Sequence, residues 1–158
     1  MPPYETQALI RRVRRRGGRC VLNLAPALPI DLALLPEIDL LVANESEAAT
    51  LSADPMKIGR QLRQGFVVTQ GAAGGSAFLS DGSRLDFPAL AIDPVDTTGA
   101  GDTFVGVLAA ALDLGASLEA ALRRASAAAG LACLARGAQT AMPGAAAIDA
   151  AMAHLPPG

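Results

Sequence analysis

The sequence is poor in the residues that build metal and redox sites. Among its 158 residues are one histidine, His154, and two cysteines, Cys20 and Cys133. Without any Cys–His spacing, the chain offers no zinc site. Both cysteines lie in apolar stretches, which favours buried free thiols over a disulfide and predicts a protein of the reducing cytoplasm. The single lysine, Lys57, lacks the glycine-rich setting of a P-loop, and this disfavours a P-loop nucleoside triphosphatase.

Long apolar runs and an excess of positive charge are also lacking. Charge or glycine interrupts each apolar run before membrane-spanning length, and no apolar signal core follows the basic residues near the N-terminus, so we expect no membrane partner. The formal net charge of −2 argues against general nucleic-acid binding. An arginine-rich face on the helix predicted over residues 4–16 is more simply a solvated surface than a nucleic-acid patch.

The hydrophobic content, 51%, is enough for a single domain with a real core over residues 1–158. Strands are predicted over residues 20–24, 38–42, 66–69, 76–80, 83–87 and 90–95. Helices are predicted over residues 4–16, 44–51, 54–64, 103–114, 118–135 and 145–154. Strands that alternate with helices indicate α/β layering around a parallel sheet.

The stretch that organises the rest of the chain is the motif Asp96-Thr97-Thr98-Gly99-Ala100-Gly101-Asp102-Thr103-Phe104. Apolar residues at helical spacing follow it, so Gly99 to Gly101 should lie at a helix N-terminus, where free N–H groups and the helix dipole favour an anion. Asp102 falls in the first turn, where a carboxylate could accept a proton during phosphoryl transfer. From spacing alone, an ordinary dipole-stabilising first-turn Asp is an equally good interpretation.

The string DTTGAGD, followed by Thr103 and Phe104, resembles the C-terminal signature of the ribokinase-like (PfkB) carbohydrate kinases. The resemblance implies a Rossmann-like three-layer α/β/α fold and ATP-dependent phosphorylation of a sugar hydroxyl. In such a protein Asp102 would be the catalytic base, and the anion hole would consist of Gly99, Ala100 and Gly101. A Rossmann dehydrogenase is disfavoured because Phe104 stands where its third glycine should be.

A second motif begins at Asn44, directly after the strand predicted over residues 38–42. Asn44 is a good helix N-cap, and Glu47 completes a capping-box pair with it. The pair also resembles the family's N-x-x-E motif, which implies that Glu47 orients Mg²⁺ through water and that Asn44 lies near the ATP phosphates. Both interpretations can hold together, because Mg²⁺ usually keeps several waters beside a carboxylate.

Further ATP contacts are implied by the glycine-rich turn after the strand at residues 66–69. It resembles the family's T-x-G…G element, which makes Thr69, Gly71 and Gly74 candidates, although a merely flexible hairpin is the alternative. Ala72 and Ala73 replace the polar or basic side chains that are common in relatives, so contacts there would use the backbone. Ser126 falls where many relatives carry an Asn that touches adenine.

The string Arg136-Gly137-Ala138-Gln139 resembles the family's [KR]-G-A-x loop beside the nucleotide base. The resemblance implies a monovalent cation, K⁺, between this loop and the start of the motif. The implied oxygen ligands belong to Asp96, Thr98, Ala132, Ala135 and Gly137.

The resemblance covers the C-terminal, nucleotide-binding half of the family, beginning near Asn23. Nothing in the chain resembles the sugar-binding half with its Gly-Gly motif and lid, so we expect a fold truncated at its N-terminal half. A sheet interrupted there would expose an edge that permits self-association. The alternative function is therefore an inactive nucleotide-binding remnant or one piece of a split kinase, with nucleotide and sugar as the expected partners of the active form.

Overall fold

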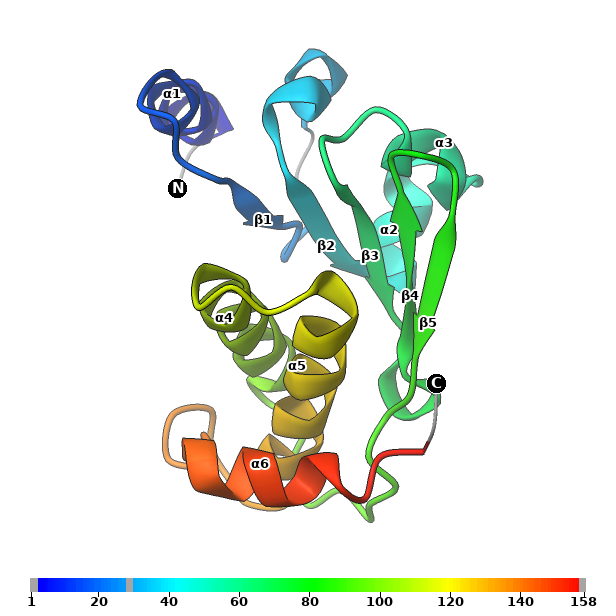
Figure 1. Cartoon of the computed structure of the whole chain (residues 1–158), viewed down its shortest axis with the longest axis vertical. Coiled ribbons are helices and arrows are strands. Elements are labelled where there is room, and N and C mark those ends of the chain that lie inside the picture. Colours follow the sequence, from blue (N-terminus) through cyan, green and yellow to red (C-terminus); the bar gives the residue numbers. More distant parts are fainter. Residues whose placement is uncertain (1–2, 28–29, 157–158) are drawn as a thin grey trace. The chain divides into compact units, whose positions relative to one another are not determined.

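The computed structural model describes residues 3–27 and 30–156 as two compact units (Figure 1). The first unit, here called the sheet unit, comprises residues 1–70 and 76–85 apart from the undescribed positions. The second, here called the helical unit, comprises residues 71–75 and 86–158, again apart from the undescribed positions. Each unit has its own core, and each is described by itself below.

One five-stranded sheet runs in the order β1-β2-β3-β4-β5 (Figure 1). Its strands are β1 (Val21–Asn23), β2 (Leu40–Asn44), β3 (Gly65–Thr69), β4 (Gly75–Leu79) and β5 (Arg84–Phe87). The first three strands are parallel, with Leu22 opposite Leu41 and Leu41 opposite Phe66. A turn at Gly82, whose φ is 88°, connects β4 to β5. The predicted α/β fold is thereby confirmed, with a mixed sheet whose first three strands are parallel.

The described residues form six α-helices and two short 3₁₀ turns. They are α1 (Pro3–Arg15), α2 (Glu45–Leu51), α3 (Pro55–Gly59), α4 (Ala100–Asp113), α5 (Leu118–Ala132), α6 (Ala145–Met152), η1 (Leu32–Glu37) and η2 (Gly71–Ala73). Helix α1 ends in a Schellman motif, in which the N–H of Gly18 donates to the carbonyl of Val13 and that of Gly17 to Arg14. No helix in the described ranges has the length and apolarity needed to cross a bilayer.

Two of the predicted elements are wrong. Residues 90–95 form no strand; Pro88 and Pro94 remove ladder donors, and the N–H of Val95 donates to the carbonyl of Cys133 at 2.8 Å. The helix predicted over residues 54–64 ends at Gly59. It does not continue because the N–H groups of Arg63 and Gln64 donate to the carbonyls of Ile38 and Asp39, just before β2, rather than to the preceding turn.

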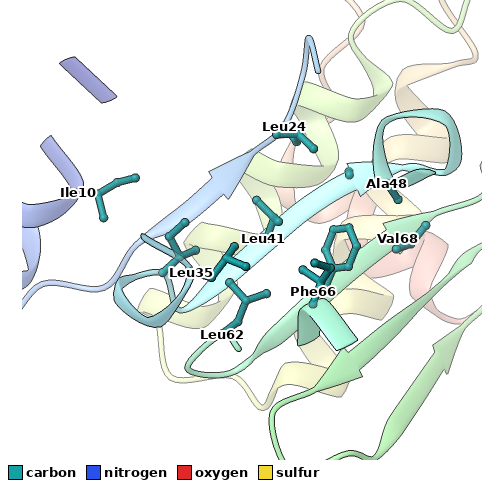
Figure 2. Close-up of a cluster of buried hydrophobic side chains, with 11 residues drawn as sticks. Ile10, Leu24, Leu35, Leu41, Ala48, Leu62, Phe66 and Val68 are labelled. Carbon is teal, nitrogen blue, oxygen red and sulfur yellow. The ribbon is translucent and has the colours of Figure 1, made fainter. Parts of the chain in front are cut away.

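The core of the sheet unit lies on one face of β2 and β3. Figure 2 shows Leu35, Leu41, Leu62 and Phe66 gathered there, and all four are buried. The alternate residues of both strands, such as Leu40 and Val67, are buried too. Burial on both faces is typical of parallel strands and accounts for the continuous apolar runs in the sequence.

The helical unit is built on close packing of small side chains. Helix α4 packs along α5, and α5 contacts α6. The buried cluster consists of Ala127, Ala128, Ile148, Ala151 and Leu155. A Cβ at Gly130 would lie 2.8 Å from the Cβ of Leu90. The segment that contains Leu90 therefore packs against α5 at Gly130, where the helix has no side chain. The alanine-rich sequence therefore serves packing here.

Candidate active site

The N-terminus of α4 lies where the motif predicts it. Gly99 is the N-cap with a φ of 79°, and exposed Asp102 falls in the first helical turn. Gly99 cannot be replaced without strain, because a Cβ there would lie 2.8 Å from the Cβ of Ala138. This left-handed conformation turns the chain into the helix, and the close approach of Ala138 keeps the turn in place.

The first turn of α4 leaves hydrogen-bond donors unused. The N–H of Ala100 donates to the carbonyl of Thr97 at 3.3 Å, whereas those of Gly99, Gly101 and Asp102 reach no acceptor in the described part of the chain. A Cβ at Gly101 would meet no atom within 4 Å. Free N–H groups at a helix N-terminus suit an anion, and the space beside Gly101 is open outside its own helix. The unused donors thus include Gly99 and Gly101 of the predicted anion hole, while Ala100 already has an acceptor.

Asp96 connects the motif to the loop that follows α5. Its carboxylate accepts 3.0 Å hydrogen bonds from the N–H groups of Thr98 and Gly137. These bonds, together with one from the Thr98 hydroxyl, which is the largest contribution, lower the pKa of Asp96 to about 2. The N–H groups of Val95 and Asp96 both donate to the carbonyl of Cys133. The structure therefore brings the two sequence segments of the predicted cation site together.

Backbone oxygens near this connection are available as ligands. Helix α5 ends at Ala132, and within the described ranges no donor reaches the carbonyls of Ala132, Ala135 or Gly137. Free carbonyls at a helix C-terminus carry partial negative charge. These carbonyls and the Asp96 carboxylate are the oxygens that the predicted cation site would use.

In the sheet unit, Asn44 and Glu47 form the predicted capping box at the end of β2. The Asn44 side chain accepts from the N–H of Glu47, and the Glu47 carboxylate accepts from the N–H of Asn44, each at 2.9 Å. The capping bond uses one carboxylate oxygen, Oε2, and leaves Oε1 without a hydrogen-bond donor among the described residues. A carboxylate held in one orientation with an oxygen to spare fits a water-mediated Mg²⁺ contact.

The candidates around the glycine-rich turn differ in their surroundings. Thr69 lies opposite Asn44 in the sheet, and its hydroxyl is 3.4 Å from the carbonyl of Ala43. Gly71 has a φ of 56° and open space where a Cβ would be. Gly74, with a φ of 87°, is enclosed: a Cβ there would lie 2.1 Å from the carbonyl oxygen of Phe87. Gly71 can therefore approach a ligand, while Gly74 is required by packing.

The structure gives Ser126 a partner within the protein. It is buried on α5, and its hydroxyl donates to the carbonyl of Pro88 at 2.6 Å. The base contact assigned to it stays a prediction, since only the lone pairs of the hydroxyl remain for another partner.

Three contributions were missed by the sequence analysis. Gln70 donates to Glu45 at 3.0 Å and so ties the start of the glycine-rich turn to the first residue of α2. Ala138 fills the space beside Gly99. Thr103 carries a buried hydroxyl with no partner among the described residues. Of these three, only Ala138 had a signal in the sequence. It is a small residue in the R-G-A string, and close backbone approach requires a small side chain.

Comparison with known proteins identifies the family. Residues 3–145 match the pfkB family of carbohydrate kinases. The chain is 37% identical over 126 residues to ribokinase of Bacillus subtilis, an alignment that covers 78% of this chain and 42% of that protein. The chain therefore belongs to the pfkB family of carbohydrate kinases.

Solved structures confirm the ribokinase-type fold. Ribokinase of Thermotoga maritima matches 96% of this chain with a TM-score of 0.85 and 28% identity, over 54% of its own chain. Arabidopsis thaliana ribokinase, solved with ribose and ATP, matches 96% of this chain with a TM-score of 0.87 and 29% identity, over 53% of its own chain. The chain spans about half the length of the relatives it matches.

Proposed function

We propose that the chain is the nucleotide-binding and catalytic part of a sugar kinase, which transfers a phosphoryl group from ATP to a sugar hydroxyl. The observation that carries this proposal is the N-terminus of α4, where free N–H groups and open space at Gly101 adjoin the carboxylate of Asp102. A similar ribokinase was solved with ribose and ATP, which supports the choice of substrates.

In this function Asp102 takes the proton of the attacking hydroxyl, and the free N–H groups of Gly99 and Gly101 stabilise the charge on the phosphoryl group. Glu47 would hold Mg²⁺ through water, which would neutralise charge on the ATP phosphates. Asn44, Thr69 and Gly71 would contact the nucleotide. No step requires a covalent bond to the protein, because positioning and electrostatics account for most of phosphoryl-transfer catalysis.

The experiment that tests this function is a sugar kinase assay with Mg-ATP and ribose. The chain is assayed both by itself and with a sugar-binding half supplied by co-expression. We expect Asp102→Asn to lower turnover by about 10²–10⁴ while ATP affinity stays close to that of the unsubstituted chain, since the amide keeps the size but cannot take a proton. The matched control is Asp93→Asn, an exposed carboxylate outside the motif.

Near-normal turnover in Asp102→Asn would reduce Asp102 to a first-turn helix residue. The alternative function is an inactive remnant or one piece of a split kinase. Binding of Mg-ATP without turnover in any combination would support the remnant. Turnover only with the added half would support the split kinase.

We also propose that K⁺ is held by Asp96, Thr98 and the free carbonyls after α5. Their oxygens support this, as described above. Melting curves in K⁺ and Na⁺ at equal ionic strength test it: we expect a higher Tm or tighter ATP binding in K⁺. Identical curves with identical ATP affinity would remove the cation from the proposal.

A further inference from the structure

The hydroxyl of Thr103 is the one buried side-chain polar group without a hydrogen-bond partner in the described part of the chain. Thr103 is 4% exposed and directly follows Asp102 in α4. A buried hydroxyl without a partner destabilises a fold, whereas a valine of the same shape at this position would not. The free protein therefore carries a local defect beside the proposed catalytic carboxylate.

The usual local solution is absent at Thr103. A threonine hydroxyl in a helix commonly donates to the carbonyl four residues earlier, which here belongs to Gly99. That carbonyl accepts the backbone N–H of Thr103 at 2.9 Å, and the side-chain hydroxyl makes no bond to it. The hydroxyl is thus left for a partner that the free protein does not provide.

Helix geometry places this hydroxyl over the first turn. Each Cα–Cβ bond in an α-helix tilts toward the N-terminus, so a side chain covers the turn before its own Cα. For Thr103 the residues three and four positions earlier are Ala100 and Gly99, and the N–H of Gly99 is unused. Two independent observations therefore meet at the same turn: free backbone donors with open space at Gly101, and an unpaired buried hydroxyl.

We propose that Thr103 is a positioning residue of the anion site at α4, and that its hydroxyl gains a hydrogen bond only when an anion is bound there. The partner is a water molecule that hydrates the bound phosphoryl group. The hydroxyl reaches this water as the first turn adjusts around the anion. Thr103 acts through this water and does not touch the reacting atoms. The inference rests on the proposed function, because it takes the ligand of this turn to be a phosphoryl group.

The test compares Thr103→Val and Thr103→Ser with the unsubstituted chain, using inorganic phosphate as the probe. Phosphate binding is followed by the NMR shifts of the Gly99, Gly101 and Asp102 amides, and stability by urea unfolding without phosphate. We expect Thr103→Val to be at least as stable as the unsubstituted chain, yet to bind phosphate about 2- to 10-fold more weakly. Thr103→Ser should restore the affinity.

In Thr103→Val, unchanged or higher stability together with weaker phosphate binding distinguishes a positioning role from a structural role. As a control, Thr50→Val removes an exposed hydroxyl that does have a partner, the carbonyl of Glu47 at 2.6 Å, and should leave phosphate affinity unchanged. Loss of stability in Thr103→Val without phosphate would overturn the inference, because it would mean that the hydroxyl is paired in the free protein. Unchanged phosphate affinity in Thr103→Val would overturn it as well.

The same measurements separate this inference from the proposed function. A chain that binds phosphate at these amides and shows the Thr103 pattern, but phosphorylates no sugar even with the added sugar-binding half, would contradict the kinase and leave the inference standing. An active kinase in which Thr103→Val binds phosphate normally would do the reverse. If the unsubstituted chain shows no shift of these amides with phosphate, the inference is wrong, whatever nucleotide binding the other elements provide.

Discussion

The carboxylate of Asp96 accepts a hydrogen bond from the N–H of Gly137, 41 residues later in the chain, at 3.0 Å. Ala138, which follows Gly137, occupies the space where Gly99, three residues after Asp96, would carry a side chain. The loop after α5 and the turn into α4 therefore support each other. The conformation of the turn at Gly99 depends on residues far away in the sequence, and the Asp96–Gly137 bond is where this dependence can be tested.

Replacing Asp96 by Asn should destabilise the protein in a pH-dependent way. Its pKa in the folded state, about 2, lies below the ordinary value of 3.8, so the ionised carboxylate stabilises the fold above about pH 4. This contribution is lost as the pH falls toward 2. We expect Asp96→Asn to have the lower Tm at pH 7 and the difference to shrink with acidification. Thermal melts from pH 7 to pH 2 check this.

The control for that experiment is Asp93→Asn, which alters an exposed carboxylate of the same segment that has no donor within the described residues. Its Tm should follow that of the unsubstituted chain at every pH. A gap between Asp96→Asn and the unsubstituted chain that stays constant from pH 7 to pH 2 would argue against the hydrogen-bonded carboxylate as its source.

Gly101→Ala should separate anion binding from helix stability. Gly101 and Gly106 both lie in α4, and a Cβ at either would meet no atom within 4 Å. Alanine at either position should keep or raise stability, by up to about 1 kcal/mol, because glycine is a poor helix former. Only Gly101→Ala should weaken phosphate and ATP binding, since its methyl group adds bulk in the first turn, next to the free N–H groups, whereas Gly106 lies further along the helix. Calorimetric titration of both variants would show this, and equal affinities would contradict it.

Glu47→Gln should separate the capping role of Glu47 from its proposed Mg²⁺ role. Glutamine preserves a capping box, so the unfolding free energy should change by less than about 0.5 kcal/mol. The neutral amide is a poorer partner for hydrated Mg²⁺, and we expect Mg²⁺ to support ATP binding about 10-fold less well. ATP titrations over a range of Mg²⁺ concentrations measure this effect.

Asn44→Ala is the complementary variant. It removes the side-chain acceptor for the N–H of Glu47 and should cost about 1 kcal/mol of stability. If Glu47→Gln cost as much stability and left the Mg²⁺ dependence intact, Glu47 would be a capping residue only.

Gly74→Ala should destabilise the fold far more than Gly71→Ala. Both glycines have positive φ, 87° and 56°, which costs an alanine about 1–2 kcal/mol. At Gly74 the added Cβ would also meet the Phe87 carbonyl at 2.1 Å, which should add about 1–3 kcal/mol, whereas at Gly71 the space is open. Urea unfolding of the two variants measures the difference. Similar losses in both would show that the segment at Phe87 yields readily.

The local sequence determined most of the elements and several of their ends. Gly17 and Gly18 close α1, Asn44 and Glu47 cap α2, and the glycines of the motif start α4, because each of these features depends on residues within a few positions of one another. The motif also identified the family, since its residue types and spacing are specific. These conclusions needed no knowledge of what packs against what.

Only the tertiary structure decided which groups have partners. It ended α3 at Gly59 by taking the N–H groups of Arg63 and Gln64 for another segment, and it left residues 90–95 without a strand. It also showed that Gly74 is enclosed while Gly101 is open, and that the Thr103 hydroxyl has no partner among the residues that the structure describes. Such facts depend on contacts between residues distant in sequence, and neither spacing nor propensity carries information about them.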